Sequence, residues 1–311
     1  MKKRFIIPSF LMFIFIIGSY SLPIAVNGAT WGVAPSSTYN FDLTNVDISL
    51  QIGSLYNYSA NSITFGGGEN VIPQGSQVIM TVTEVDSQNV SYELASGGLT
   101  ENHELSNETF EDRIKELMLL PLKFAEEEIP IEEIMRGYTG LDYILVPTLN
   151  TTWDKFDVFD NPIYLSIMEQ SYSSTGNAID LQARTMVNYT QDQCIFDWYV
   201  AGNYSENSGT YFDIVYNLKT VYELSTGLLL GMRVDALVDG TYENQTTTGI
   251  IQSEVVRDGY SLGPFVLPGD EPEFSGFISG LIPGFHWYLV PVGFIILYGA
   301  LVFIKRKSLK K

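Results

Sequence analysis

The chain of 311 residues contains few of the residues that carry enzyme and metal chemistry. It has one cysteine, Cys194, and two histidines, His103 and His286. A single thiol cannot form an internal disulfide, and no CxxC pair is present to bind zinc. The GxSxG, HExxH and phosphate-loop patterns are also missing. The sequence therefore predicts no catalytic residue, no cofactor site and no metal site, and we expect the protein not to be an enzyme.

Positive charge is scarce between the two ends of the chain. The sequence has 17 Lys and Arg against 36 Asp and Glu, which gives a net charge of −19. Three basic residues lie at positions 2–4 and five at 305–311, so the part between them carries nine against 36, a difference of −27. Such a field repels polyanions. The composition therefore predicts that nucleic acid is not a partner.

The basic C-terminus follows an apolar run. Residues 285–304 hold twenty positions without Asp, Glu, Lys or Arg, and a helix of that length spans about 30 Å, the thickness of a bilayer's hydrocarbon core. Aromatic rings near one end and cations at the other are typical of membrane interfaces. These interface residues are Trp287, Tyr288, Lys305, Arg306 and Lys307. The pattern predicts a transmembrane helix at 285–304, in contact with membrane lipid, and a cytoplasmic tail at 305–311.

The N-terminus has the pattern of a signal peptide. A basic stretch precedes an apolar stretch at 5–17, and the small residues Gly28 and Ala29 follow, so we expect a signal peptide at 1–29. An uncleaved first anchor is the alternative. Both interpretations place residues from about 30 to 282 outside the cell. The sequence thus predicts a single-pass type I protein of the cell membrane with most of the chain extracellular.

Asn-x-Ser/Thr sequons are frequent in this extracellular part. There are seven, where the 17 Asn and 48 Ser and Thr of the chain would give about 2.6 by chance. Asn57, Asn89, Asn203 and Asn244 lie in or beside predicted turns, and Asn107 precedes a predicted helix, so we expect glycans at these five. Asn188 lies in a predicted strand and requires an exposed face, and the state of Asn150, after a strand end, stays open.

Apolar periodicity predicts an α+β fold. Residues 44–52 and the hairpin at 77–94 alternate as strands do, 109–120 and 162–172 have helical signals, and strand follows strand from 178 onward. We expect a long curved antiparallel β-sheet with a few helices packed on one face, plus the C-terminal transmembrane helix.

The domain limits follow from this pattern. The β-rich domain is predicted at 30–260, either as one unit or as subdomains 30–150 and 151–260. A Pro- and Gly-rich stalk is predicted at 261–284.

Three further stretches allow more than one interpretation. The run at 141–147 is typical of a buried strand, and His103 is expected in a polar loop between hairpin and helix. The acidic residues at 154, 157 and 160 with Asn161 suggest calcium ligands or chance proximity, since their spacing is not that of an EF-hand. The apolar stretch at 117–124 indicates either a core helix or a helix lining an apolar cavity.

The chain resembles a group of archaeal surface proteins known by "choice-of-anchor" names. The resemblance rests on "WYLVPVGFIILYGALVFIKRK", "IPQGSQVIMTVTEVDSQNVSYEL", "YILVPTLNTTWDKF" and "VYELSTGLLLGMRV". The stretch "LSTGLLLG" is also similar to turns in the curved sheets of bacterial lipoprotein carriers. The resemblance implies an exported, anchored, β-rich domain and no catalytic residue. We therefore expect a non-catalytic surface protein, an interaction or envelope module with a surface-protein partner. Binding of an apolar ligand or lipid between sheet and helices is the alternative.

Overall fold

The computed structural model describes residues 30–65, 70–107, 110–118, 140–166, 178–206 and 209–265. The chain divides into two compact units, Met1–Gly263 and Pro264–Lys311, and the description below concerns the first. None of the helices in these described ranges has the length and apolar character needed to cross a membrane. The predicted transmembrane helix at 285–304, its interface residues and the predicted signal peptide at 1–29 lie outside the described residues.

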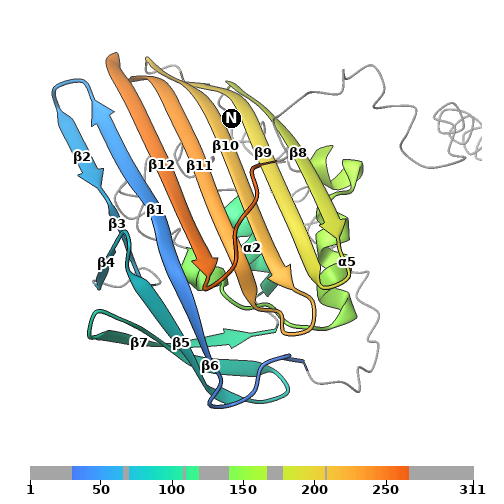
Figure 1. Ribbon diagram of the computed structural model, residues 1–311. Helices are drawn as coiled ribbons and strands as arrows, with labels where there is room; N and C mark the ends of the chain where they lie inside the picture. Colours follow the sequence, from blue (N-terminus) through green and yellow to red (C-terminus); the bar gives the residue numbers. More distant parts are fainter. Residues whose placement is uncertain are drawn as a thin grey trace, which may run out of the picture. The chain divides into compact units, whose positions relative to one another are not determined.

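The first unit is built on one antiparallel sheet of ten strands (Figure 1). The strand order is β7-β6-β5-β1-β12-β11-β10-β9-β8, and β2 pairs with β1 beside this path. The strands are β1 (Thr38–Ile52), β2 (Tyr56–Ala60), β5 (Gln77–Val85), β6 (Asn89–Ser96), β7 (Leu99–Ser106), β8 (Ala178–Tyr189), β9 (Gln193–Glu206), β10 (Thr210–Glu223), β11 (Leu229–Tyr242) and β12 (Gln245–Arg257). A separate two-stranded sheet joins β3 (Ser62–Thr64) to β4 (Val71–Pro73). The prediction of an antiparallel, mostly β fold with a few helices is confirmed.

Strand β1 joins β2 and β5 to the later strands of the sheet. It pairs with β12 from Phe41 to Ile52, with β5 through its first residues and with β2 through its last. A bulge between Leu43 and Asn45 changes which parity of residue is buried along the strand. The observed strand therefore begins earlier than the predicted strand at 44–52. The bulge interrupts the alternation of apolar residues, so the sequence pattern showed only the part after it. Strands from both candidate subdomains, 30–150 and 151–260, share this one sheet.

The long strands β8 to β12 have two chemically different faces. In β9, the inner face carries Cys194, Phe196, Trp198 and Val200, all 1% exposed or less, and the alternate residues form the outer face. This strict alternation is what predicted the strands, and the hairpin meander from β8 to β12 is confirmed. Helix α2 (Phe110–Met118) lies against the inner face, behind the sheet in Figure 1.

The turn between β10 and β11 requires glycine. Gly227 has φ 70°, in the left-handed region that a side chain disfavours. A Cβ at this position would also lie 1.9 Å from the carbonyl oxygen of Val146. The Val146 N–H donates in turn to the Gly227 carbonyl at 2.9 Å. This turn also holds the 141–147 segment through that hydrogen bond.

That segment is buried, as predicted, but it is not a strand. The 3-10 helix η2 (Gly140–Tyr143) occupies its first half, and Leu145 then forms an isolated bridge with Leu228. The segment bonds to the β10–β11 turn instead of lying along a strand edge. A run of apolar residues indicates that a segment is buried, but it does not show that the segment is a strand.

The helices agree with the sequence in part. The predicted helix at 109–120 is confirmed as α2, in which Phe110, Ile114, Leu117 and Met118 are buried at helical spacing. The predicted helix at 162–172 begins at Pro162, and its residues after 166 lie outside the described part. Helix α5 (Asn150–Phe159) was not predicted. The N-cap residue, Leu149, offers no side-chain hydrogen bond to the helix, so the usual start signal is missing.

Phe156 of α5 lies at the centre of an aromatic cluster. Its ring is fully buried and contacts rings from α2, α5, β9 and β10 at centroid distances of 5.5 to 6.1 Å. The partners are Phe110, Trp153, Phe159, Phe196 and Tyr222. Aromatic pairs at these distances add to the free energy of burial. The unpredicted helix therefore adds an aromatic contact between α2 and the sheet.

We predict that Phe156→Ala lowers the free energy of unfolding by about 3–5 kcal/mol, because it leaves a cavity among five rings. Val158→Ala on the same helix is the control, since Val158 is 47% exposed and should cost under about 1 kcal/mol. Urea unfolding followed by tryptophan fluorescence measures both. Equal losses in the two variants would contradict the central role of Phe156.

Candidate functional site

The polar tips of inner-face aromatic residues bond to backbone carbonyls near the helices. Trp198 Nε1 donates to the Met118 carbonyl at 3.1 Å, and the Tyr216 hydroxyl donates to that of Leu117 at 2.9 Å. The Tyr222 hydroxyl donates to a third carbonyl, in η2, at 3.0 Å. The last carbonyls of a helix have no partner inside the helix, so these donors satisfy buried acceptors. These three side-chain donors therefore join the sheet to α2 and η2, and their hydrogen bonds are made within the chain.

His103 lies in strand β7, and the prediction of a polar loop was wrong. Its ring stacks on Tyr92 of β6 with centroids 5.3 Å apart and planes at 11°, and its side chain is 14% exposed. Nε2 lies 3.7 Å from Glu101 Oε1. Burial lowers the pKa of His103, Glu101 opposes this shift, and Arg113 of α2 adds to it. The neutral imidazole is therefore the form that the fold favours.

Strand β7 escaped the sequence analysis because its inward residues are polar. Glu101, His103 and Leu105 alternate toward the interior, and of these only Leu105 is apolar. An apolar-polar period of two was therefore missing. The pairing with β6, in which Tyr92 lies opposite His103, is the contact that fixes this strand.

The acidic residues considered as calcium ligands lie on or just after α5. Asp154 and Asp157 are exposed on the helix and Asp160 ends it. Desolvation raises the pKa of Asp160 to about 6, although a hydrogen bond from the Val187 N–H opposes the shift. Across the described ranges, no three His, Cys, Asp or Glu side chains lie close enough to hold a metal ion. Cys194 is buried nearby as a free thiol, and burial raises its pKa to about 12.

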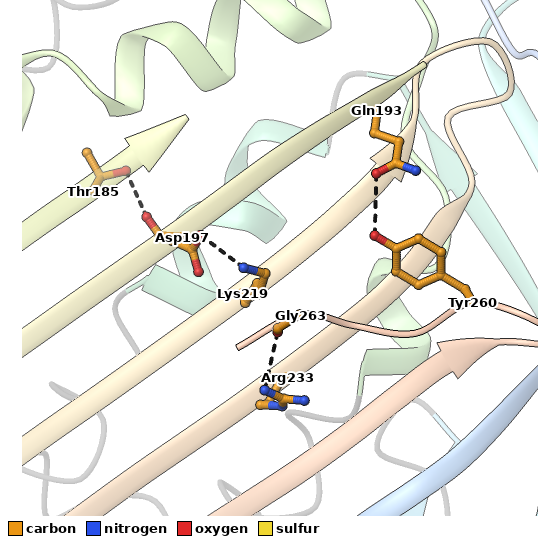
Figure 2. A network of polar contacts seen from close by, with 7 residues as sticks. All are labelled: Thr185, Gln193, Asp197, Lys219, Arg233, Tyr260 and Gly263. Carbon is orange, nitrogen blue, oxygen red and sulfur yellow. Dashed lines mark hydrogen bonds and ion pairs between the residues drawn. The ribbon is translucent and has the colours of Figure 1, made fainter. Parts of the chain in front are cut away.

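The outer face carries a row of charges across four strands. Asp197, Lys219, Arg233 and Glu254 lie directly opposite one another in register. Lys219 Nζ donates to Asp197 Oδ2 at 3.3 Å, and the residues are 5% and 1% exposed (Figure 2). Arg233 pairs with Glu254 beside them. Buried ion pairs are costly to break because the remaining charge stays desolvated.

Residues 258–263 cross the outer face after β12. The Tyr260 hydroxyl donates to Gln193 Oε1 at 3.4 Å, and Arg233 donates to the Gly263 carbonyl at 3.4 Å (Figure 2). Leu262 is buried in a small apolar cluster with Val221, Leu230 and Val256. The first residues of the predicted stalk, 261–263, thus pack on the sheet and belong to the first compact unit.

The sequon asparagines lie at the surface. Four are exposed and three are half-buried. The exposed ones are Asn57, Asn150, Asn188 and Asn244, and the half-buried ones are Asn89, Asn107 and Asn203. Asn188 therefore meets the condition of an exposed face.

Asn203 was expected in or beside a turn. It lies within strand β9, opposite Asp213 and three residues before the strand ends. Asn244 does lie in a turn, the one between β11 and β12, with φ 66°.

Comparison with known proteins gives no family. No protein-family model matches the chain, and no curated protein matches it. Among solved structures, the dehydratase domain from the CurJ module of curacin polyketide synthase overlaps with a TM-score of 0.12 and 9% identity, covering 80% of this chain and 81% of that one. An inactive mutant of the CurJ dehydratase in complex with a compound gives a TM-score of 0.12 and 11% identity, covering 79% and 81%. At such TM-scores these overlaps carry no information on fold or activity.

We predict that His103 makes the protein less stable in acid. The pKa of His103 is lowered in the folded state. Its contribution to stability is therefore complete above the unfolded pKa of about 6.5, and it is lost as the pH falls from there through the lower pKa of the folded state. His103→Phe keeps a ring on Tyr92 and removes this titration. Between pH 7.5 and 5.5, the wild-type unfolding free energy should fall relative to the variant.

The comparison with His103→Phe also removes a competing effect. The raised pKa of Asp160 means that its protonation near pH 6 stabilises the fold on acidification, which is the opposite sign. Both proteins keep Asp160, so their difference isolates His103. Parallel pH profiles for the two proteins would contradict the prediction.

We predict that Lys219→Met costs about 3–5 kcal/mol, because it leaves the buried carboxylate of Asp197 without its cation. The double variant Asp197→Leu with Lys219→Met should recover most of that loss. Arg233→Met, in the same row but at a pair with 27% and 18% exposed side chains, is the control and should cost about 1 kcal/mol. Chemical unfolding measures all three variants, and a double variant that loses as much free energy of unfolding as Lys219→Met alone would refute the coupling.

Proposed function

We propose that this chain is a single-pass type I membrane protein whose extracellular unit is a non-catalytic interaction or envelope module, partnered by other surface proteins. The apolar run at 285–304 and the basic tail at 305–311 support the anchor and its orientation. The part of the chain between the two basic ends carries a net charge of −27, which supports its export.

The observation that carries this proposal is the exposure of the sequons. Each of the seven asparagines is exposed or half-buried in the described structure. A glycan needs an accessible side-chain amide and room beside it. An excess of sequons at accessible positions supports a chain that meets the glycosylation machinery outside the cytoplasm.

The state of the interior supports a scaffold rather than a reaction centre. The inner-face donors Trp198, Tyr216 and Tyr222 bond to carbonyls of the chain itself. The aromatic cluster around Phe156 fills the space between α2, α5 and the sheet. Interaction with partners then falls to the outer face and the strand edges of a rigid sheet.

Protease treatment of intact cells tests the topology. We expect loss of the extracellular unit and survival of a C-terminal fragment that contains residues 285–311. Peptide mapping of the native protein should find glycans at the accessible sequons, beginning with Asn57 and Asn244. A protected extracellular unit, or bare asparagine at all seven sites, would overturn the proposal. Native mass spectrometry of the full chain in detergent tests the alternative function. A specific co-purifying lipid would favour a carrier of apolar ligands instead.

A further inference from the structure

The outer face carries a second cross-strand row, near the β11–β12 turn. Direct register pairs place its residues opposite one another on β9, β10, β11, β12, β1 and β2. The row consists of Asn203, Asp213, Asp239, Thr248, Gln51 and Asn57. Two sequon asparagines thus share one row, which continues beyond Asn203 to Asp180 of β8, and Asn244 lies in the adjoining turn.

An exposed aromatic ring lies beside Asn203. Tyr211 on β10 is opposite Ser205, the third residue of the Asn203 sequon, and it is 41% exposed. Its hydroxyl donates to Asp213 Oδ1 at 2.6 Å. Asp213 is the residue directly across from Asn203. The hydrogen bond therefore holds the exposed ring along β10, with its hydroxyl at the residue opposite Asn203.

The next row along the strands is apolar. Ala201, Val215, Leu237 and Ile250 lie opposite one another on the outer face. Leu237 is 43% exposed and the other three are half-buried. At about 3.3 Å of rise per residue, this row lies only about 7 Å from the Asn203 row. Exposed apolar surface of this kind is normally covered or used.

The carboxylates between these features suit sugar hydroxyls. Asp213 and Asp239 lie directly opposite each other, which is unfavourable for two like charges. Tyr211 donates to Asp213, and Thr248 Oγ1 donates to Asp239 Oδ1 at 3.2 Å. Carboxylate oxygens accept further hydrogen bonds, and sugar hydroxyls are donors. A ring for the C–H face of a sugar and carboxylates for its hydroxyls thus adjoin one sequon.

We propose that the outer face around Tyr211 is a carbohydrate platform, and that its occupant is the glycan attached to Asn203 of the same chain. The inference rests on the proposed function, because it requires an exported, glycosylated chain. The first sugar lies against the Tyr211 ring, and later sugars extend over the apolar row toward Leu237. An attached ligand meets its site without the entropy cost of association, so shallow contacts suffice.

A double-mutant cycle on the full-length protein, purified from the native membrane in detergent, tests the platform. Ser205→Ala removes the sequon, Ser205→Thr retains it, and Tyr211→Ala removes the ring. The glycan should stabilise the protein when Tyr211 is present and lose most of this effect with Tyr211→Ala. We expect a coupling of about threefold to tenfold in the unfolding equilibrium constant, as for an aromatic stacking contact.

Two further variants sharpen the cycle. Leu237→Ser should also couple to the glycan, and it keeps the test decisive if Tyr211→Ala fails to fold. Tyr189→Ala is the matched control, because Tyr189 is 38% exposed on β8 and lies outside both rows. Its coupling to the Asn203 glycan should be less than about twofold.

The outcomes separate the two proposals. An occupied Asn203 with coupling below twofold at both Tyr211 and Leu237 overturns the platform and leaves the surface-protein function standing. A bare Asn203 beside other occupied sequons does the same. Bare asparagine at all seven sequons overturns both. Binding of a free oligosaccharide to the protein that carries the Asn203 glycan, lost with Tyr211→Ala, would show that the platform takes sugars of another molecule and would reject the attached glycan as its occupant.

Discussion

Three aromatic side chains reach from the sheet to buried carbonyls, and the first compact unit depends on them. Trp198 and Tyr216 bond to the last carbonyls of α2, and Tyr222 bonds to η2. A helix end buried against a sheet leaves acceptors that water cannot reach, and each unsatisfied one costs about 1–3 kcal/mol. Long side chains with a polar tip solve this problem, because the ring adds apolar area and the tip supplies the donor. The inner face of β9 and β10 is therefore committed to holding the helices.

In the described part of the chain the outer face does not pack against helices, and the strand register arranges its side chains in rows across the sheet. One row contains the buried Asp197–Lys219 pair, the next is polar, the next is apolar and the next contains Asn203. Such rows arise because side chains alternate along every strand and antiparallel pairs bring them into line. The segment 258–263 then covers the apolar cluster that includes Val221 and Val256. Burial of the charged pair on a sheet face that usually meets solvent is the least expected feature of this arrangement.

The sequence predicted those elements in which the apolar period was intact. Strands β8 to β12 and helix α2 bury residues at regular spacing, and all of them were found. Strand β7 carries the half-buried polar residues Glu101 and His103 on its inner side, so the apolar period that marks a strand was missing. Helix α5 begins without a capping side chain, and its aromatic residues are common in strands as well. In both cases the tertiary contacts, His103 on Tyr92 and Phe156 in its cluster, decide the structure.

The candidate site shows a different limit of sequence analysis. Each sequon was visible from three consecutive residues, but Asn203 was expected in or beside a turn and lies inside β9, three residues before its end. Its relation to Tyr211, Asp213 and Leu237 depends on the pairing of three strands, and local patterns do not report register. The same holds for Asn57. It shares a row with Asn203 because β2 pairs with β1 and β1 pairs with β12. Surface chemistry on an antiparallel sheet is therefore defined by rows across strands, and a residue's neighbours along the chain point to the opposite face.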